Sequence, residues 1–117
     1  NNQHILSSTN ENITTKVCTK TFDAPTNRPI EGATIKLYAM EWQMMGPPQQ
    51  TWLTLYDPID GSEASDGVNT GPTGCVAFKA FYPGGWPACT CTELQGTATR
   101  GTDIENIWAG RVCTPCG

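Results

Sequence analysis

Apolar and polar residues alternate with a period of two over much of this chain. The alternation is clearest in residues 33–42, where Ala33, Ile35 and Leu37 fall on one side and the residues between them on the other. Successive side chains of a β-strand point to opposite faces, so this pattern predicts half-buried strands. The same period predicts further strands over residues 14–22, 51–56, 74–82, 89–95 and 104–113.

Turn-forming residues separate the predicted strands. Proline, asparagine and glycine recur in residues 25–32, and a loop rich in Gly, Asp, Ser and Pro covers residues 57–73. Any helix is expected to be a short turn near residues 103–108. Several short strands between turns predict an all-β fold, a β-sandwich with Greek-key connections.

The length of 117 residues fits one domain. We expect the sandwich to occupy residues 14–117 and residues 1–13 to form a polar N-terminal arm with little periodicity. Such an arm is expected to be disordered unless it docks on its own domain or on another subunit. Ile5 and Ile13 are its expected apolar anchors.

An even number of cysteines in a short chain is typical of an extracellular disulfide framework. The six are Cys18, Cys75, Cys89, Cys91, Cys113 and Cys116. The two closely spaced pairs near the C-terminus also allow a zinc site or a redox pair, but one residue between Cys89 and Cys91 is narrow for zinc, and a βαβ context is missing. We expect three disulfides, with Cys89 and Cys91 bridging to different partners and one bridge tying the C-terminal tail to the sheet.

The run Pro29-Ile30-Glu31-Gly32-Ala33-Thr34-Ile35-Lys36-Leu37 resembles the second strand of prealbumin-like sandwich modules. These include transthyretin-like proteins, carboxypeptidase regulatory domains and collagen-adhesin B-type repeats. Thr70-Gly71-Pro72-Thr73-Gly74 resembles the turn that leads into a later strand of these modules. The resemblance covers about residues 15–82 and implies a disulfide-stapled, immunoglobulin/prealbumin-like sandwich. It implies little about function, because the architecture hosts carriers, adhesins and scaffolds.

The resemblance also raises one covalent alternative. Some collagen-adhesin-like modules form a Lys–Asn isopeptide bond, and here it would join Lys16 or Lys20 to Asn106 with help from Glu31. Because three disulfides are already expected, we favour the disulfides over an isopeptide bond as the covalent cross-links of this domain.

Composition excludes several classes of function. Charged residues make up 15% of the chain, below the roughly 25% of typical soluble domains, and the net charge is −4 without a basic cluster. Nucleic acid and anionic membranes are therefore not expected partners. No apolar run approaches the ~18 residues of a membrane span. The single histidine, His4, lies in the polar arm, so no catalytic set is apparent and neither enzymatic activity nor a cofactor is expected.

Two motifs suggest surface chemistry. Asn12-Ile13-Thr14 is an N-glycosylation sequon, which requires Asn12 to face solvent. The loop of residues 57–73 carries Asp57, Asp60, Glu63 and Asp66, whose oxygens are weak candidates for calcium. The alternative is a solvated acidic turn, since the spacing does not match an EF-hand.

Four tryptophans provide much of the apolar mass. Trp86 lies between Gly85 and Pro87 in a turn and is the likeliest of the four to be exposed. For Trp86 and Trp108 the sequence gives equal weight to an exposed residue that contacts a ligand or interface and to a buried structural residue. Trp42 and Trp52 are assigned to the core.

Two functions remain. In the first, the protein is a secreted structural subunit of an extracellular filament or matrix, assembling with itself by donation of the N-terminal arm. The chain begins at Asn1 rather than Met, which we take as the mark of a removed signal peptide. In the second, the protein is a monomeric secreted module that binds carbohydrate, lipid or a protein receptor.

Overall fold

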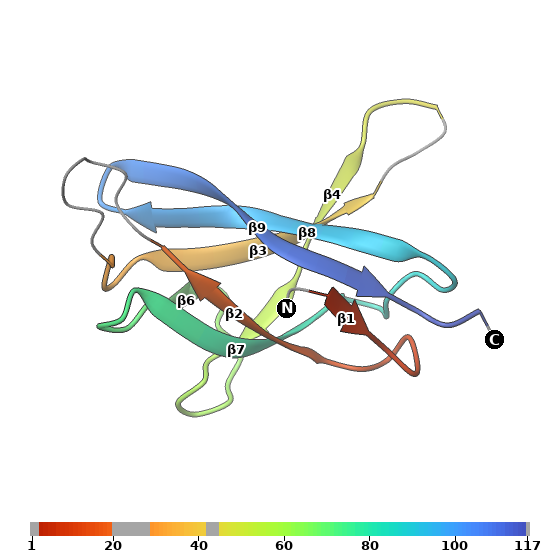
Figure 1. Ribbon diagram of the computed structural model, residues 1–117, viewed down its shortest axis with the longest axis horizontal. Coiled ribbons are helices and arrows are strands. Elements are labelled where there is room, and N and C mark those ends of the chain that lie inside the picture. Colours follow the sequence, from red (N-terminus) through yellow and green to blue (C-terminus); the bar gives the residue numbers. More distant parts are fainter. Residues whose placement is uncertain (1–2, 20–28, 42–44, 117) are drawn as a thin grey trace.

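The computed structural model describes residues 3–19, 29–41 and 45–116. These residues form strands and turns without a helix, so the all-β prediction is confirmed for the described part of the chain (Figure 1). The strands are β1 (Gln3–Ile5), β2 (Ile13–Cys18), β3 (Thr34–Glu41), β4 (Gln49–Trp52), β5 (Thr54–Tyr56), β6 (Val68–Asn69), β7 (Cys75–Phe81), β8 (Cys91–Arg100) and β9 (Asp103–Cys113).

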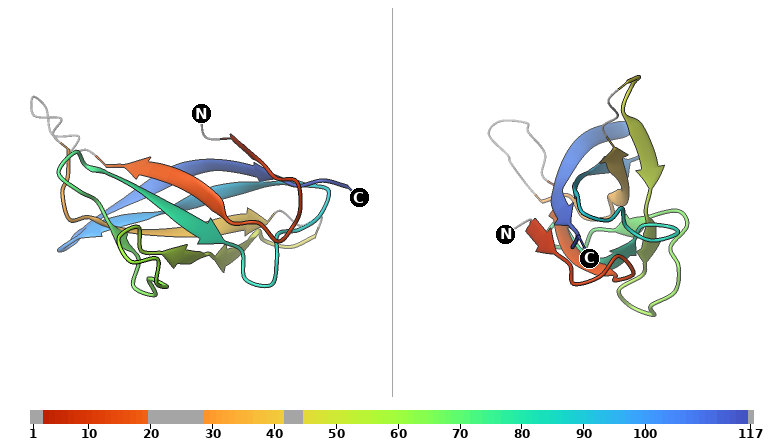
Figure 2. Two further views of the ribbon diagram at one scale, coloured as in Figure 1. Left: turned by 90° about the horizontal axis from the view of Figure 1, so that it is seen from below. Right: turned by 90° about the vertical axis from the view of Figure 1, so that its right-hand side faces the viewer.

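The strands form two sheets that face each other (Figure 2). The larger sheet has the order β1-β9-β8-β3-β4, and β6 pairs with the first residues of β3 beside β4. The smaller sheet has the order β2-β7-β5. The described strands pair antiparallel, except that β1 runs parallel to β9.

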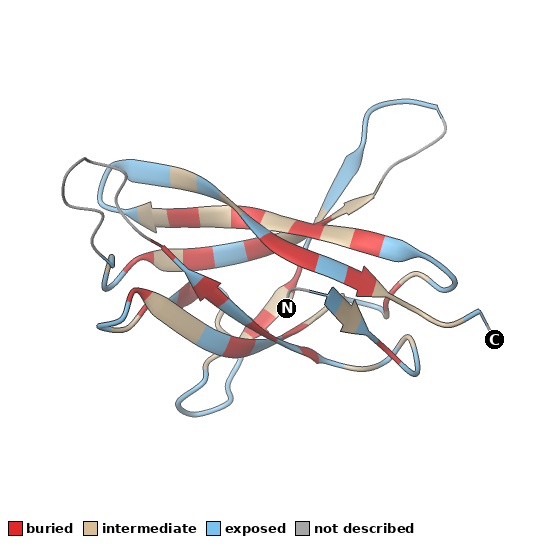
Figure 3. Cartoon of the chain, viewed as in Figure 1, coloured by how far each residue is buried: buried red, intermediate tan, exposed pale blue. Residues whose placement is uncertain are grey.

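The core lies between the two sheets, and the alternation of the sequence produces it. In β3, Ile35, Leu37 and Ala39 are fully buried, while the residues between them lie on the outer face (Figure 3). In β8, alternate residues are likewise buried between the sheets. The smaller sheet adds Phe78 and Ala80 of β7 to the core. Burial of these apolar side chains stabilises the sandwich by roughly 1.5–3 kcal/mol for each large residue.

Several predicted strand boundaries were displaced. Residues 103–108, considered for a helical turn, belong to β9. The strand predicted over residues 51–56 is divided at Leu53, where the chain leaves the larger sheet for the smaller one. The amide of Leu53 donates to the carbonyl of Leu37 at 2.9 Å, so this crossing point is tied to β3. The strand predicted from Cys89 begins at Cys91, because Cys89 has a positive φ of 56°.

Three disulfides join all six cysteines, as predicted. Cys18–Cys75 links neighbouring positions of β2 and β7, and Cys91–Cys113 does the same for β8 and β9. Cys89–Cys116 ties the C-terminal tail to the turn before β8. Among the described cysteines none is free for zinc or for a dithiol, and three such bonds are typical of proteins in oxidising, extracellular-type compartments.

The N-terminal segment docks on its own domain. Gln3–Ile5 pairs with Arg111–Cys113, and the amide of Leu6 donates to the carbonyl of Cys113 at 2.9 Å. The residues expected to anchor the N-terminal arm do not have that position on this domain. Ile5 is 74% exposed, and Ile13 belongs to β2, where it is buried. Leu6, which the sequence reasoning missed, is the buried residue at the end of β1.

Candidate functional site

Trp86 is buried, although its position in a turn made it the likeliest tryptophan to be exposed. Its amide donates to the carbonyl of Thr9 and its Nε1 to the carbonyl of Glu11, both at 2.8 Å. Its ring also contacts the ring of Tyr82, with 5.6 Å between centroids. The N-terminal segment therefore covers this turn, and Trp86 is a structural residue rather than a surface anchor.

Trp52 and Trp108 are the exposed tryptophans among the described residues, at 51% and 55%. The prediction that Trp52 belongs to the core was wrong, because it is the last residue of β4 and lies on the outer face of the sheet. Trp42, the other tryptophan assigned to the core, lies outside the described residues.

The strand register places these two tryptophans in one row with Tyr38 and Gln95. Trp52 of β4 pairs with Tyr38 of β3, Tyr38 pairs with Gln95 of β8, and Gln95 pairs with Trp108 of β9. Paired residues share a face of a sheet. Trp52, Tyr38, Gln95 and Trp108, which we call the aromatic row, therefore cross the outer face of the larger sheet. Gln95 pairs with Trp108 and the preceding Leu94 pairs with Gly110, so Ala109 is an extra, unpaired residue that forms a β-bulge in β9.

Each aromatic side chain of the row is held by a further contact. The Tyr38 hydroxyl donates to Oε1 of Gln95 at 3.2 Å, and the ring of Trp52 stands edge-on to Tyr38 with 5.1 Å between centroids. Nε1 of Trp108 donates to Oε1 of Glu93 at 3.0 Å. The row is thus fixed in position while the rings at its two ends remain accessible to solvent.

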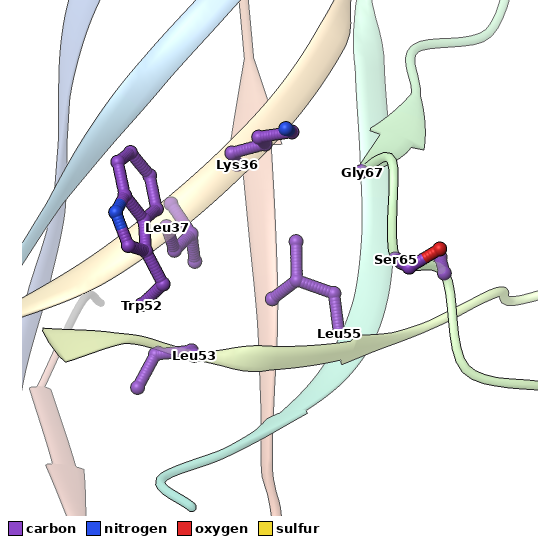
Figure 4. Close-up of a pocket in the computed structure, with 8 residues that line it drawn as sticks. Lys36, Leu37, Trp52, Leu53, Leu55, Ser65 and Gly67 are labelled. Carbon is purple, nitrogen blue, oxygen red and sulfur yellow. The ribbon is translucent and has the colours of Figure 1, made fainter.

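A pocket of about 360 Å³ lies beside Trp52, where β4 and β6 leave a gap along β3 (Figure 4). Lys36, Leu37 and Trp52 line one side. Leu55 and Ser65 line the opposite side. The pocket is therefore an apolar recess with a lysine at its rim, next to one end of the aromatic row.

A groove of about 590 Å³ follows the opposite side of the sandwich. It is lined by residues 14–18 of β2, by Ile107 and Trp108 of β9, and by His4 of β1. Within the described part of the chain, β1 covers only the last three residues of β9 on this side. The edge of β9 over residues 103–110 thus has no partner strand there.

His4 lies in this groove with a partly buried side chain. Its Nε2 is buried without a hydrogen-bond partner among the described residues. Burial lowers the pKa of His4 below its usual value, because the cationic imidazolium loses hydration. The histidine is therefore held in its neutral form at neutral pH.

The acidic loop does not assemble a calcium site in the described structure. Oδ1 of Asp57 accepts the amide of Ile59, and Oδ1 of Asp60 accepts both the amide and the hydroxyl of Ser62. These bonds to Ser62 lower the pKa of Asp60. No group of three metal-ligating side chains occurs among the described residues, so Asp57, Asp60, Glu63 and Asp66 form a solvated turn instead.

The other predicted residues lie on the surface. Asn12 is exposed just before β2, as a glycan would require. Lys16 and Asn106, proposed for an isopeptide bond, are both exposed, as is Glu31, while Lys20 lies outside the described residues.

No protein-family model, curated protein or solved structure matches this chain. No helix among the described residues is long and apolar enough to cross a membrane. The aromatic row and the open edge of β9 are therefore the features of the described structure that point to a function.

Proposed function

We propose that the protein is a secreted, non-enzymatic structural subunit that assembles with other copies by exchange of β1. The observation that carries this proposal is the edge of β9 that faces away from β8. There the three-residue β1 covers Arg111–Cys113, and residues 103–110 have no partner strand on that side among the described residues. An open edge offers unpaired amides and carbonyls to another chain.

Exposed apolar side chains accompany this edge. Ile104 is 71% exposed and Trp108 is 55% exposed on β9, and Ile5 is 74% exposed on β1. Monomeric proteins usually protect such an edge with charges, a proline or a covering loop. Asp103 and Glu105 are the acidic residues of the open stretch, and Ile104, Ile107 and Trp108 are its large apolar residues.

The N-terminal segment supplies the donor strand. Exchange between copies would keep the register of β1 on β9, with His4 opposite Val112, so that its main-chain bonds would form between chains instead of within one. The chain between β1 and β2, residues 6–12, would act as the hinge. An exchange that does not close on itself produces a filament.

Other features support the compartment and the class. Three disulfides and a low content of charged residues fit a secreted protein, and the exposed Asn12 fits a glycoprotein. The resemblance of residues 15–82 to prealbumin-like modules with Greek-key connections is compatible with a scaffold, because that architecture includes adhesins.

Particle size tests the proposal first. Light scattering and negative-stain microscopy would compare the native protein with a variant that lacks residues 1–5. This deletion removes β1 but keeps Leu6 and the carbonyls of Thr9 and Glu11 that bond to Trp86. We expect filaments or large particles from the native protein only, and a monodisperse monomer in both samples would refute the proposal.

A disulfide trap then identifies the donor. Gln3 and Arg111 are register partners and both are exposed, so the double variant Q3C/R111C should form a new disulfide at the β1–β9 pairing. Exchange predicts a ladder of covalent multimers on a non-reducing gel, which collapses to monomer on reduction. The single variants Q3C and R111C serve as controls. A cross-link found only within monomers would show that β1 stays on its own chain.

A further inference from the structure

The outer face of the larger sheet carries a pre-ordered line of aromatic side chains. The two tryptophans are about half exposed, which is costly for large apolar side chains on a soluble protein. Their orientation is nevertheless fixed by Tyr38, Gln95 and Glu93. Fixed, exposed aromatic rings are a feature of binding surfaces, because little entropy is lost when a ligand arrives.

The spacing of the row follows from the strands. Trp52 and Tyr38 lie on adjacent strands, and Trp108 lies two strands beyond Tyr38. Neighbouring strands are about 4.8 Å apart, so Tyr38 and Trp108 are separated by roughly 10 Å and the whole row spans roughly 14 Å. One strand step is close to the length of one pyranose unit in an extended sugar chain. A linear chain laid across the strands would therefore place successive or alternate rings over the aromatic side chains.

The polar surroundings fit an uncharged ligand. Among the residues that the structure describes, Lys36 on β3 and Arg111 on β9 are the cations of this face, and Glu93 is the register partner of Arg111. The side chains of Thr97 and Asn106 are register partners in the next row and offer hydroxyl and amide groups. Sugar rings present apolar C–H faces to aromatic rings and hydroxyl groups to such polar neighbours. With charges of both signs, the face favours neither a polyanion nor a polycation.

We propose that the aromatic row binds a neutral, extended polysaccharide chain, stacked on Trp52 and Trp108 and guided by Tyr38 and Gln95. The chain would cross the strands of the larger sheet and end at Trp108, which also lines the groove between β2 and β9. The pocket beside Trp52 lies at one end of this path and can receive a substituent of the sugar. The proposed binding uses side chains on the face of the sheet, whereas strand exchange uses the main-chain groups at the edge of β9.

Sedimentation with insoluble polysaccharides tests the proposal. The probes are cellulose, chitin and a β-1,3-glucan, together with soluble oligosaccharides from two to six sugar units. We expect the native protein to bind at least one polymer and to prefer the longer oligosaccharides of that type. W52A and W108A should each weaken binding about tenfold, as expected when one of a few anchoring aromatic contacts is lost.

Matched variants make the result specific to the row. Ile59→Ala removes a side chain that is 94% exposed but lies outside the row, so it controls for general surface stickiness. Far-UV circular dichroism and thermal unfolding verify that each variant is folded. Binding lost in W52A and W108A but kept in I59A would support the site. Lack of binding to every probe, or binding that W52A and W108A leave unchanged, would overturn it. Loss of self-association alone in W52A or W108A would instead identify the face as a contact between copies and would also overturn the proposal.

Discussion

Replacing Trp86 with alanine should destabilise the fold strongly, although the residue lies in a glycine-proline turn. Only 3% of its surface is exposed, so the substitution removes a fully buried aromatic side chain, at a cost of about 3–5 kcal/mol. It also leaves the carbonyl of Glu11 without the Nε1 donor at 2.8 Å, which adds about 0.5–1.5 kcal/mol. The variant Trp86→Phe keeps most of the ring and should lose about 1–2 kcal/mol, mainly from this hydrogen bond.

Urea unfolding measures these differences, and Trp108→Ala is the matched control. Trp108 is the same residue type but is 55% exposed, so its truncation should cost less than about 1 kcal/mol. Hydrogen exchange provides a second measurement, because W86A should release residues 6–12 and speed the exchange of the Leu6 amide. Equal stabilities of W86A and W108A would refute the argument that the N-terminal segment covers Trp86.

Two further outcomes follow from the packing of the larger sheet. Burial lowers the pKa of His4, so undocked β1 binds a proton more readily than docked β1, and docking should weaken as the pH falls below the ordinary histidine value of about 6.5. The free energy of opening from hydrogen exchange at Leu6 should therefore fall from pH 7 to pH 5 in the native protein, and an equal fall in H4Q would contradict this cause. A Cβ at Gly96 would lie 2.1 Å from the carbonyl oxygen of Lys36, so Gly96→Ala should cost about 1–3 kcal/mol in urea unfolding. Gly71→Ala, whose nearest neighbour would lie at 3.7 Å, should change stability by less than about 0.5 kcal/mol; similar losses in both variants would argue against close strand packing at Gly96.

The number of cysteines predicted the number of disulfides but not how all of them pair. Six cysteines in a short chain predicted three bridges, and the expectation that Cys89 and Cys91 have different partners was correct. The pairing of Cys18 with Cys75 was not predictable, because it depends on β2 lying beside β7 in the smaller sheet.

The candidate site was predicted only in part. Trp86 and Trp108 were each given equal weight as exposed or buried, and the structure buries Trp86 and exposes Trp108. Trp52 was assigned to the core and is exposed. Local sequence shows that Trp86 lies in a turn, but the segment that covers it is distant along the chain. Nothing in the local pattern of Trp52 indicates that β4 ends there and that its outer face is open.

The sequence by itself determined most of the longer strands, the all-β class and the oxidised state of the cysteines, but not the short strands β1 and β6. These properties follow from a two-residue period and from composition, which are local. The tertiary structure decided which tryptophans are buried, how β1 docks on β9, and that Trp52, Tyr38 and Trp108 share one row. These properties depend on strand register and on contacts between distant segments, and a shift of one residue would move every side chain of a strand to the opposite face.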